Sequence, residues 1–491
     1  MEFADLNQTH PEYEGELWER LRLLYKGGYE LLEHAREFIP RLPNEGAQRY
    51  EYRLRHASYV PYFAQIVGYL VGALFHEPLQ VAPSRDTSAD PFYPSFSKDA
   101  DLTGRAFALV AQQAVAEALV YKRSLVCVDL PPAVEALSRA EEDALGAGRA
   151  YCYNTPISSL LDWGRDKTTG KLSWCILRSY HHERESPTER RETYRYRFTV
   201  WTLAGGIAHW ETWQTAPIKL GEAPKGNVEV EQTGNGVTSF REIPVLELAI
   251  PDELWLGNKI GPLTEEHFRK RSELEGGLAE SNVELPVLYL GSEIPAVGGA
   301  LPAEVQQDPH RGDDLVTRYQ AQGYVILGGD DKLEFAGPNG RAFELTNTKL
   351  AELRDEIHRV PHTMALSLAN TAGAVGRSGE SKREDRSATE IVLSYLASFV
   401  RDFGTDVFKC ISDSRGEKIA WAATGLDVYD VDEAEGVAAE AADVQMLDIP
   451  SPTFRREYLT RVAMRLVRNA EPETKTAIQA EINQAIPDEP I

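Results

Sequence analysis

The stretch from Ser381 to about Cys410 constrains the fold most, because its apolar residues recur at helical spacing and no proline interrupts them. Intervals of three and four residues place these side chains on one face of an α-helix. The apolar positions are Ile391, Val392, Tyr395, Leu396, Phe399, Val400, Phe403, Val407, Phe408 and Ile411. The sequence therefore predicts a helix of roughly 45 Å, whose apolar face the rest of the chain must cover.

A small, glycine-rich segment precedes this helix, and a basic cluster opens it. The segment covers residues 371–380 and contains Arg377, and the cluster consists of Lys382, Arg383 and Arg386. Glycine-rich segments of this kind are typical of loops. We expect a mobile, partly basic loop at the start of the long helix. Taken alone, the pattern also fits an ordinary loop before a core helix.

The charge of the whole chain limits the classes of partner. The 491 residues include 76 acidic and 52 basic side chains, for a net charge of -24. A protein that coats nucleic acid presents a broad basic face, which this composition does not favour. A surface past which nucleic acid slides is still compatible with it, because like charge keeps phosphate mobile.

Cysteines and apolar runs indicate neither a metal centre nor a membrane span. The four cysteines show no CxxC spacing, so we expect them to be buried, reduced side chains: Cys127, Cys152, Cys175 and Cys410. The longest apolar patch, 66–75, contains two glycines and is too short to cross a bilayer.

The first half of the chain predicts helices followed by a sheet. Helices are expected within 16–80 and over 102–121, separated by a Ser-, Asp- and Pro-rich surface loop at 86–101. A strand follows at 123–130. Alternating segments between turn residues then predict a meandering antiparallel sheet. Its expected strands lie near 150–153, 173–180, 194–203, 207–214, 228–232 and 245–250.

The second half predicts a projecting arm. Residues 263–285 form a charged helix with few apolar anchors, so we expect it to lie between partners or to line a solvated space rather than a core. Strands at 285–290, 323–327 and 333–336 precede a returning helix over 343–368. After the long helix come a short element at 419–423, an acidic stretch at 427–448, and two helices over 454–469 and 473–486, the first capped by Ser451.

The chemical motifs of the sequence are near misses. Residues 164–171 resemble a phosphate loop, but the spacing is one residue too long and Leu172 replaces the magnesium-binding hydroxyl. A hairpin turn explains them better. His358 and His362 have the spacing of a zinc helix, but Pro361 is expected to interrupt the helix there. We therefore predict a joint between helices, no metal, no cofactor and no enzyme.

The order of several short motifs resembles the portal proteins of tailed bacteriophages, in particular a subfamily carried under an uncharacterised-domain label. The opening motifs are Gly28-Tyr-Glu-Leu, Phe38-Ile-Pro, Glu45 with Tyr50-Glu-Tyr-Arg-Leu-Arg-His-Ala, and Val67 to Phe75. Later ones are Ile157 to Trp163, Trp174-Cys-Ile-Leu-Arg, Ile243-Pro-Val-Leu, and Tyr458 to Thr474. The similarity covers most of the chain, and the order of the motifs is its specific part.

The resemblance implies an α+β subunit with a wing, a two-helix stem, a small β clip, a long tunnel helix and a helical crown. By position, the wing covers 1–251 and 382–449, the latter including the long helix. The stem helices correspond to 252–285 and 343–370, the clip to 286–342, the tunnel loop to 371–381 and the crown to 450–491.

The resemblance also implies a function. Portal subunits form a ring, usually twelvefold, at one capsid vertex of the virion, and they assemble in the host cytoplasm. Double-stranded DNA passes through the ring with weak contacts. The implied partners are the terminase motor, the head–tail adaptor, and the major capsid and scaffold proteins, with no membrane. Candidate residues at the DNA tunnel are Arg377, Lys382, Arg383, Arg386, Lys259, Arg269, Lys270 and Arg271.

Two other functions stay open at this point. Carboxylates are abundant, so a hydrolase with a carboxylate site on the 150–250 sheet is one alternative. The other is a minor head protein that forms no channel. For each candidate cation, an ordinary solvated surface charge is also an alternative.

Overall fold

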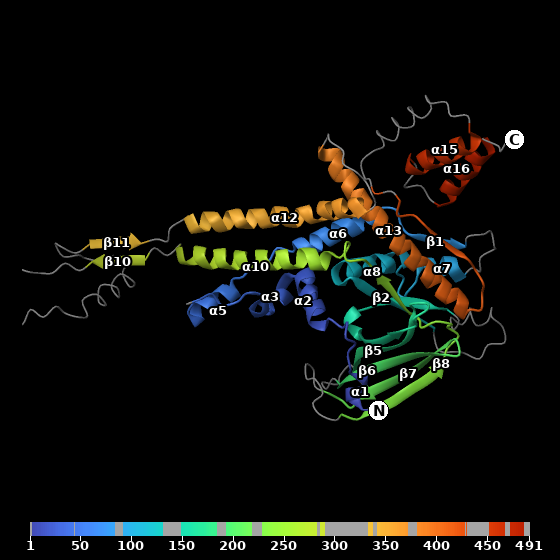
Figure 1. The fold of residues 1–491 in the computed structure, drawn as a ribbon, viewed down its shortest axis with the longest axis horizontal. Coiled ribbons are helices and arrows are strands. Elements are labelled where there is room, and N and C mark those ends of the chain that lie inside the picture. The colour runs from blue at the N-terminus through green and yellow to red at the C-terminus, as the bar shows by residue number, and fades with distance from the viewer. Residues whose placement is uncertain are drawn as a thin grey trace, which may run out of the picture.

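The computed structural model describes residues 2–43, 45–83, 92–130, 149–183, 193–218, 228–281, 285–289, 332–336, 341–371, 381–427, 429, 451–466 and 472–485. Helices and antiparallel strands combine in it as the predicted α+β class requires. A body of helices and sheets carries a long helical arm on one side, and the C-terminal helices lie near the opposite end (Figure 1).

The first part of the body is helical, as predicted. Its helices are α1 (Phe3–Leu6), α2 (Gly15–Lys26), α3 (Gly28–Glu33), α4 (Ala35–Phe38), α5 (Ala47–Arg55) and α6 (Tyr62–Leu74). α2 and α3 meet at Gly27, which has a φ of 59°. Residues other than glycine rarely adopt this backbone angle. α6 buries Phe63, Val67, Leu70 and Leu74 completely. This helix thus forms part of the main core.

The loop expected at 86–101 is wrong in part. Residues 92–98 form helix α7 (Phe92–Lys98), and it buries Phe92, Tyr93 and Phe96. Pro94 stands in the first turn, where a helix tolerates the missing N–H. The next helix, α8 (Phe107–Tyr121), is apolar over most of its surface rather than amphipathic. It therefore lies inside the body.

Two antiparallel sheets build the rest of the body. A three-stranded sheet has the order β3-β2-β9, with β2 (Arg123–Asp129) between β3 (Tyr151–Thr155) and β9 (Val245–Ala249). The five-stranded sheet is a meander of β4 (Leu160–Arg165), β5 (Leu172–Glu183), β6 (Thr193–Ala204), β7 (Ile207–Thr215) and β8 (Val230–Val237). The meander is confirmed, whereas the assignment of 150–250 to one sheet is wrong.

The turn between β4 and β5 is the hairpin that the sequence predicts in place of a phosphate loop. The Asp166 carboxylate accepts hydrogen bonds from the backbone N–H groups of Thr168 and Thr169, at 2.9 and 2.8 Å. Gly170 adopts a φ of 70°, which closes the turn. This carboxylate thus fills the turn and leaves no cradle for a phosphate.

The long helix is α13 (Ser381–Ser414), and it lies through the main core, as its periodicity predicts. Val392, Leu396, Val400 and Phe408 are at most 1% exposed, whereas Tyr395 is 40% exposed. α13 packs against the three-stranded sheet, α6 and α8. It also covers a two-stranded sheet of β1 (Gln80–Pro83) and β12 (Trp421–Thr424).

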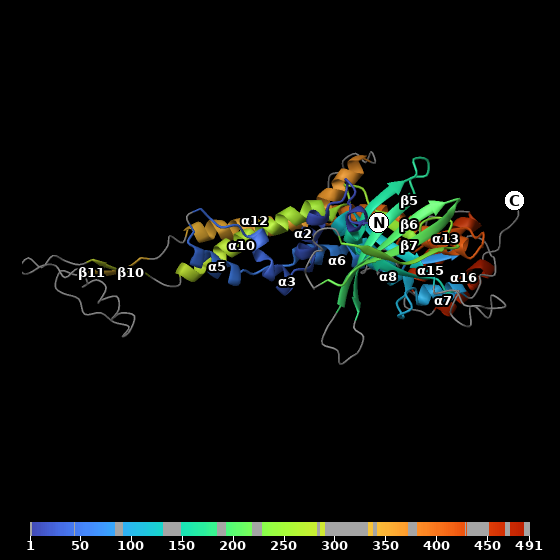
Figure 2. The ribbon, with the colours of Figure 1, turned by 90° about the horizontal axis from the view of Figure 1, so that it is seen from below.

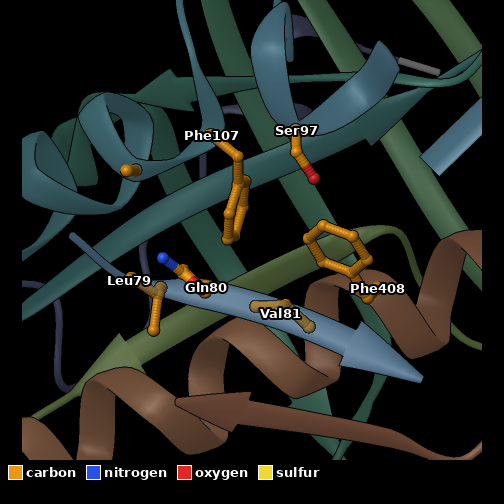
Figure 3. A pocket seen from close by; sticks show the side chains of 7 residues that line it. Leu79, Gln80, Val81, Ser97, Phe107 and Phe408 are labelled. Carbon is orange, nitrogen blue, oxygen red and sulfur yellow. The ribbon is translucent and has the colours of Figure 1, made fainter. Parts of the chain in front are cut away.

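A small cavity lies where β1 crosses these helices (Figure 3). Ser97, Phe107 and Phe408 are among the side chains that line it, and its volume is about 180 Å³. Sites for small molecules usually begin at roughly 300 Å³. The cavity is therefore a packing gap of the body rather than a ligand site.

The arm consists of two long helices and a short hairpin. The helices are α10 (Leu256–Ser281) and α12 (Arg341–Thr371), and the strands are β10 (Leu285–Tyr289) and β11 (Lys332–Ala336). β10 pairs antiparallel with β11 beyond the ends of both helices (Figure 1). The same arm projects from the body in the perpendicular view (Figure 2). The strand expected at 323–327 lies outside the described residues.

At the C-terminus, α15 (Pro452–Leu466) and α16 (Pro472–Ala485) form the predicted helical pair. The backbone N–H of Phe454 donates to Ser451 Oγ at 3.2 Å, which confirms the predicted cap. The four cysteines are free and buried, also as predicted. No helix among the described residues is long and apolar enough to span a membrane.

Candidate functional site

α10 lies in the middle of the arm. α12 packs along one side of it, and α2, α4 and α5 pack along the other (Figure 1). The two arm helices approach closely at Gly277, where an added methyl group would stand 2.6 Å from Phe343 Cε1. Counted together with these N-terminal helices, the arm is therefore three layers deep, and α12 and α5 form its two outer layers.

The sequence prediction for α10 is wrong in one respect. We expected residues 263–285 to lie between partners or to line a solvated space rather than a core, but Phe268 is completely buried and Leu274 is 8% exposed. The polar residues Thr264 and Ser272 are also buried. The exposed charges of the arm belong mainly to α12, in which only Leu353, Ile357, Val360, Pro361 and Met364 are buried among 341–364.

Arg269, one of the candidate tunnel residues, connects α10 to the body. Its Nε donates to the carbonyl oxygen of Phe38 at 2.8 Å, and its guanidinium pairs with Glu265 on the same helix. Glu265 also binds Arg20 of α2 through two hydrogen bonds of 2.7 and 2.5 Å. Partial burial and the neighbouring Arg20 lower the pKa of Arg269. This network holds α10 against α2 and the end of α4.

The other three candidate cations of the stem also have partners within the chain. Arg271 Nε donates to Ser58 Oγ at 2.6 Å. Lys270 pairs with Glu273 at 2.8 Å. Lys259 donates to the carbonyl oxygen of Asp252, and partial burial lowers its pKa. These side chains are partly exposed, so their exposure to a channel stays a prediction.

The candidate residues near the loop are described less fully. Arg377 lies outside the described residues, together with most of the predicted tunnel loop. Lys382, Arg383 and Arg386 stand in the first turns of α13, and the structure describes their backbone but not their side chains. α12, which precedes the loop, packs against α13, which follows it. The loop role is still a prediction.

A buried ion pair in the arm was not predicted. Arg53 of α5 and Glu45 have side chains only 4% and 2% exposed, and two hydrogen bonds of 2.9 and 2.8 Å join them. Arg53 also donates to the Pro40 carbonyl at 2.8 Å and to Ser272 Oγ of α10 at 3.5 Å. The Arg53 guanidinium lowers the pKa of Glu45. The sequence shows both residues within the motif from Glu45 to Arg53, but it does not show which partner either charge has.

The histidine pair of α12 lies within one continuous helix rather than at a joint between helices. α12 continues through Pro361 without interruption, so the predicted joint is wrong. The His358 ring packs against Tyr62 at 5.5 Å, and Tyr62 also packs against His267 at 5.1 Å. Burial and the nearby Arg271 lower the pKa of His267 to about 4. Among the described residues, no cluster of potential metal ligands occurs.

Two carboxylates beside the five-stranded sheet, Glu242 and Glu247, bind cations. Glu247 pairs with Arg123 at 3.6 Å and with Arg165, and Glu242 pairs with Lys171. Neither the cavity at β1 nor a groove along α12 includes a residue of this sheet. These contacts give no support to a hydrolase site there.

An open groove of about 510 Å³ runs along the exposed side of α12. Its charged lining residues are Glu352, Asp355, Glu356 and Arg359, and Leu263 of α10 forms part of its floor. Asp355 also pairs with Arg354 at 2.9 Å. The groove therefore presents an excess of negative charge on one outer layer of the arm.

No family model matches the sequence, and no curated protein matches it. Solved structures are similar. A protein in the neck of an empty gene transfer agent (GTA) particle, computed with C6 symmetry, matches 86% of this chain and 95% of its own, at 12% identity and a TM-score of 0.43. A protein in the neck of the native GTA particle, computed with C12 symmetry, matches 86% and 89%, at 11% identity and a TM-score of 0.38.

A third similar structure is an HK97-family phage portal protein from Corynebacterium diphtheriae. It matches 80% of this chain and 96% of its own, at 10% identity and a TM-score of 0.32. These three similar structures are two proteins from particle necks and one portal protein. At these identities and TM-scores, the function has to be inferred from the arm itself.

Proposed function

We propose that the chain is a structural subunit of a ring at a phage capsid vertex, and that the ring encloses a channel for double-stranded DNA. In this proposal copies of the arm stand side by side around a hollow axis, and DNA passes along that axis during packaging and ejection. The proposed ring belongs to the virion and contains twelve subunits.

One observation carries the proposal. Two antiparallel helices, α10 and α12, project from the body and bear a β hairpin beyond their ends (Figures 1 and 2). A long arm with charged outer layers is poorly explained as part of an isolated globular protein, because it exposes a large surface for the core that it buries. Neighbouring arms in a ring would cover that surface.

The proposed division of the chain follows the arm. Residues 252–285 and 343–370 are the stem, 286–342 the clip, 371–381 the tunnel loop and 450–491 the crown, with 1–251 and 382–449 as the wing. The net charge of -24 supports weak contact with phosphate. Cations at the tunnel loop and the stem centre the duplex.

The proposal also assigns partners. The terminase motor and the head–tail adaptor dock on the ring, and the capsid and scaffold proteins surround its wing. The chain has no catalytic step of its own in this scheme, and ATP hydrolysis belongs to the motor.

The mass of the purified protein in solution tests the proposal. Light scattering at physiological salt should give the mass of a closed ring, many times the 54.8 kDa of one chain. A monomer or dimer at all concentrations would contradict the proposal and would favour the hydrolase alternative. A large assembly without a central hole would favour a minor head protein.

A further inference from the structure

We propose that the arms of neighbouring subunits bind each other through two specific surfaces, the acidic groove of α12 and the basic face of α5, which packs beside the stem helix α10. The acidic groove consists of Glu352, Asp355, Glu356 and Arg359. The basic face consists of Arg49, Tyr52, Arg55 and His56. The inference rests on the proposed ring and names the contact that would close it.

The two surfaces lie on opposite sides of one arm. α10 separates α5 from α12, because α5 contacts α10 through Arg53 at Ser272, whereas α12 contacts α10 at Gly277 through Phe343 (Figure 1). Two different patches on opposite sides of a subunit give a head-to-tail contact, and such contacts close into rings when the rotation fits. A single self-complementary patch would give only a dimer.

The charges of the two surfaces are complementary. The groove carries three carboxylates and one guanidinium. The basic face carries two guanidinium groups, and its residues are all exposed. Complementary charge steers association and fixes the register between partners. The basic face of a second copy of this chain is therefore opposite in charge to the groove.

Apolar and aromatic side chains accompany these charges. Tyr52 is 46% exposed and stacks on His56 with ring centres 4.0 Å apart. On α12, Leu345 is 63% exposed. Tyrosine and arginine are enriched where protein interfaces are tight, because they combine a large contact area with directed hydrogen bonds. Tyr52 on α5 and Leu345 on α12 thus give both outer layers exposed apolar area that a neighbouring copy can cover.

Charge reversal and its rescue test the inference. The groove variant is Glu352→Lys/Glu356→Lys, and the face variant is Arg49→Glu/Arg55→Glu. Each variant alone should raise the protein concentration that ring assembly requires at least tenfold, as measured by light scattering. The variant that carries all four substitutions should regain rings, because opposite charges face each other again. The matched control, Glu229→Lys/Glu231→Lys, reverses two exposed carboxylates on the body and should assemble normally.

The outcomes separate this inference from the proposed function. If the unmodified protein forms no ring, the proposed function fails. If it forms rings and neither arm variant changes them, only the interface assignment is overturned. Loss of rings without rescue in the combined variant also overturns it.

A second measurement does not depend on the folding of charge variants. Tyr52→Cys/Asp355→Cys should give a ladder of covalent oligomers with a short bismaleimide, whereas each single cysteine should give none. The native cysteines are buried and should not react. Rings that give no ladder would count against the contact.

Discussion

Arg53 and Glu45 form a two-fold hydrogen-bonded ion pair that is almost fully removed from solvent, and the same guanidinium reaches Ser272 of α10. Glu45 stands just ahead of α5, and Ser272 lies 219 residues after Arg53 in the chain. The pair therefore joins one outer layer of the arm to its middle helix. In this way a charged motif near the start of the sequence contributes to a helix that comes much later in the chain.

Removing one partner of this pair should destabilise the arm. Arg53→Ala leaves the Glu45 carboxylate buried without its partner, and we expect a loss of about 3 kcal/mol in the free energy of unfolding. Denaturant unfolding followed by circular dichroism measures the change. Gln48→Ala, on the same helix, exposed and outside the basic face, serves as the control and should change stability little. Equal, small effects of both substitutions would contradict the role of the pair.

The same pair should make stability depend on acid. Arg53 lowers the pKa of Glu45 in the folded state below its ordinary value of 4.5. The unfolded chain then takes up the proton first as pH falls, so the contribution is present above pH 4.5 and is lost below it. Unfolding free energies of the native protein and of Glu45→Gln should differ at pH 7 and converge towards pH 3. A constant difference across that range would count against the lowered pKa.

The base of the arm should be intolerant of a single methyl group. At Gly257, an added Cβ would stand 2.0 Å from the carbonyl oxygen of Val120, which also accepts the indole N–H of Trp255 at 2.9 Å. Gly257→Ala should therefore lower stability by about 1–3 kcal/mol. Gly72 of α6 has open space instead, and Gly72→Ala should be neutral or stabilising by up to about 1 kcal/mol. Thermal unfolding of both variants distinguishes them, and a harmless Gly257→Ala would show that the base of the arm can adjust.

The glycine-rich loop should matter for DNA and not for assembly. Deleting residues 373–379 removes Arg377 and shortens the proposed tunnel loop, but it leaves the helices on either side. Rings should form with native mass, while packaging or retention of DNA falls. A packaging assay with the deletion variant measures this, and normal packaging would remove the proposed role of the loop.

Local patterns explain which parts of the fold were predictable. Val392, Val400 and Phe408 recur at helical spacing, so α13 could be assigned from its own residues. α7 was missed because Pro94 and its polar neighbours suggested a loop, although proline in a first turn is compatible with a helix. A helix that satisfies its own spacing can be predicted, whereas one that depends on packing partners is harder to assign.

The burial of α10 could not be predicted from its sequence, because its polar residues find partners elsewhere. Glu265 binds Arg20, and Ser272 accepts a hydrogen bond from Arg53. Both arginines belong to the N-terminal helices. Thr264 donates to the carbonyl oxygen of Ile260, which hides its polarity within the helix. A charged helix thus looked solvated in sequence, although it lies in the middle of the arm. The division of strands between two sheets depended on β2 in the same way, since its pairing with β3 and β9 joins distant segments.

Negative-stain images of the purified assembly test the central claim most directly. The account predicts top views of a ring with a central hole, lined by arms that stand side by side. Particles of ring mass in which the arms fold inward, or top views with a filled centre, would contradict it.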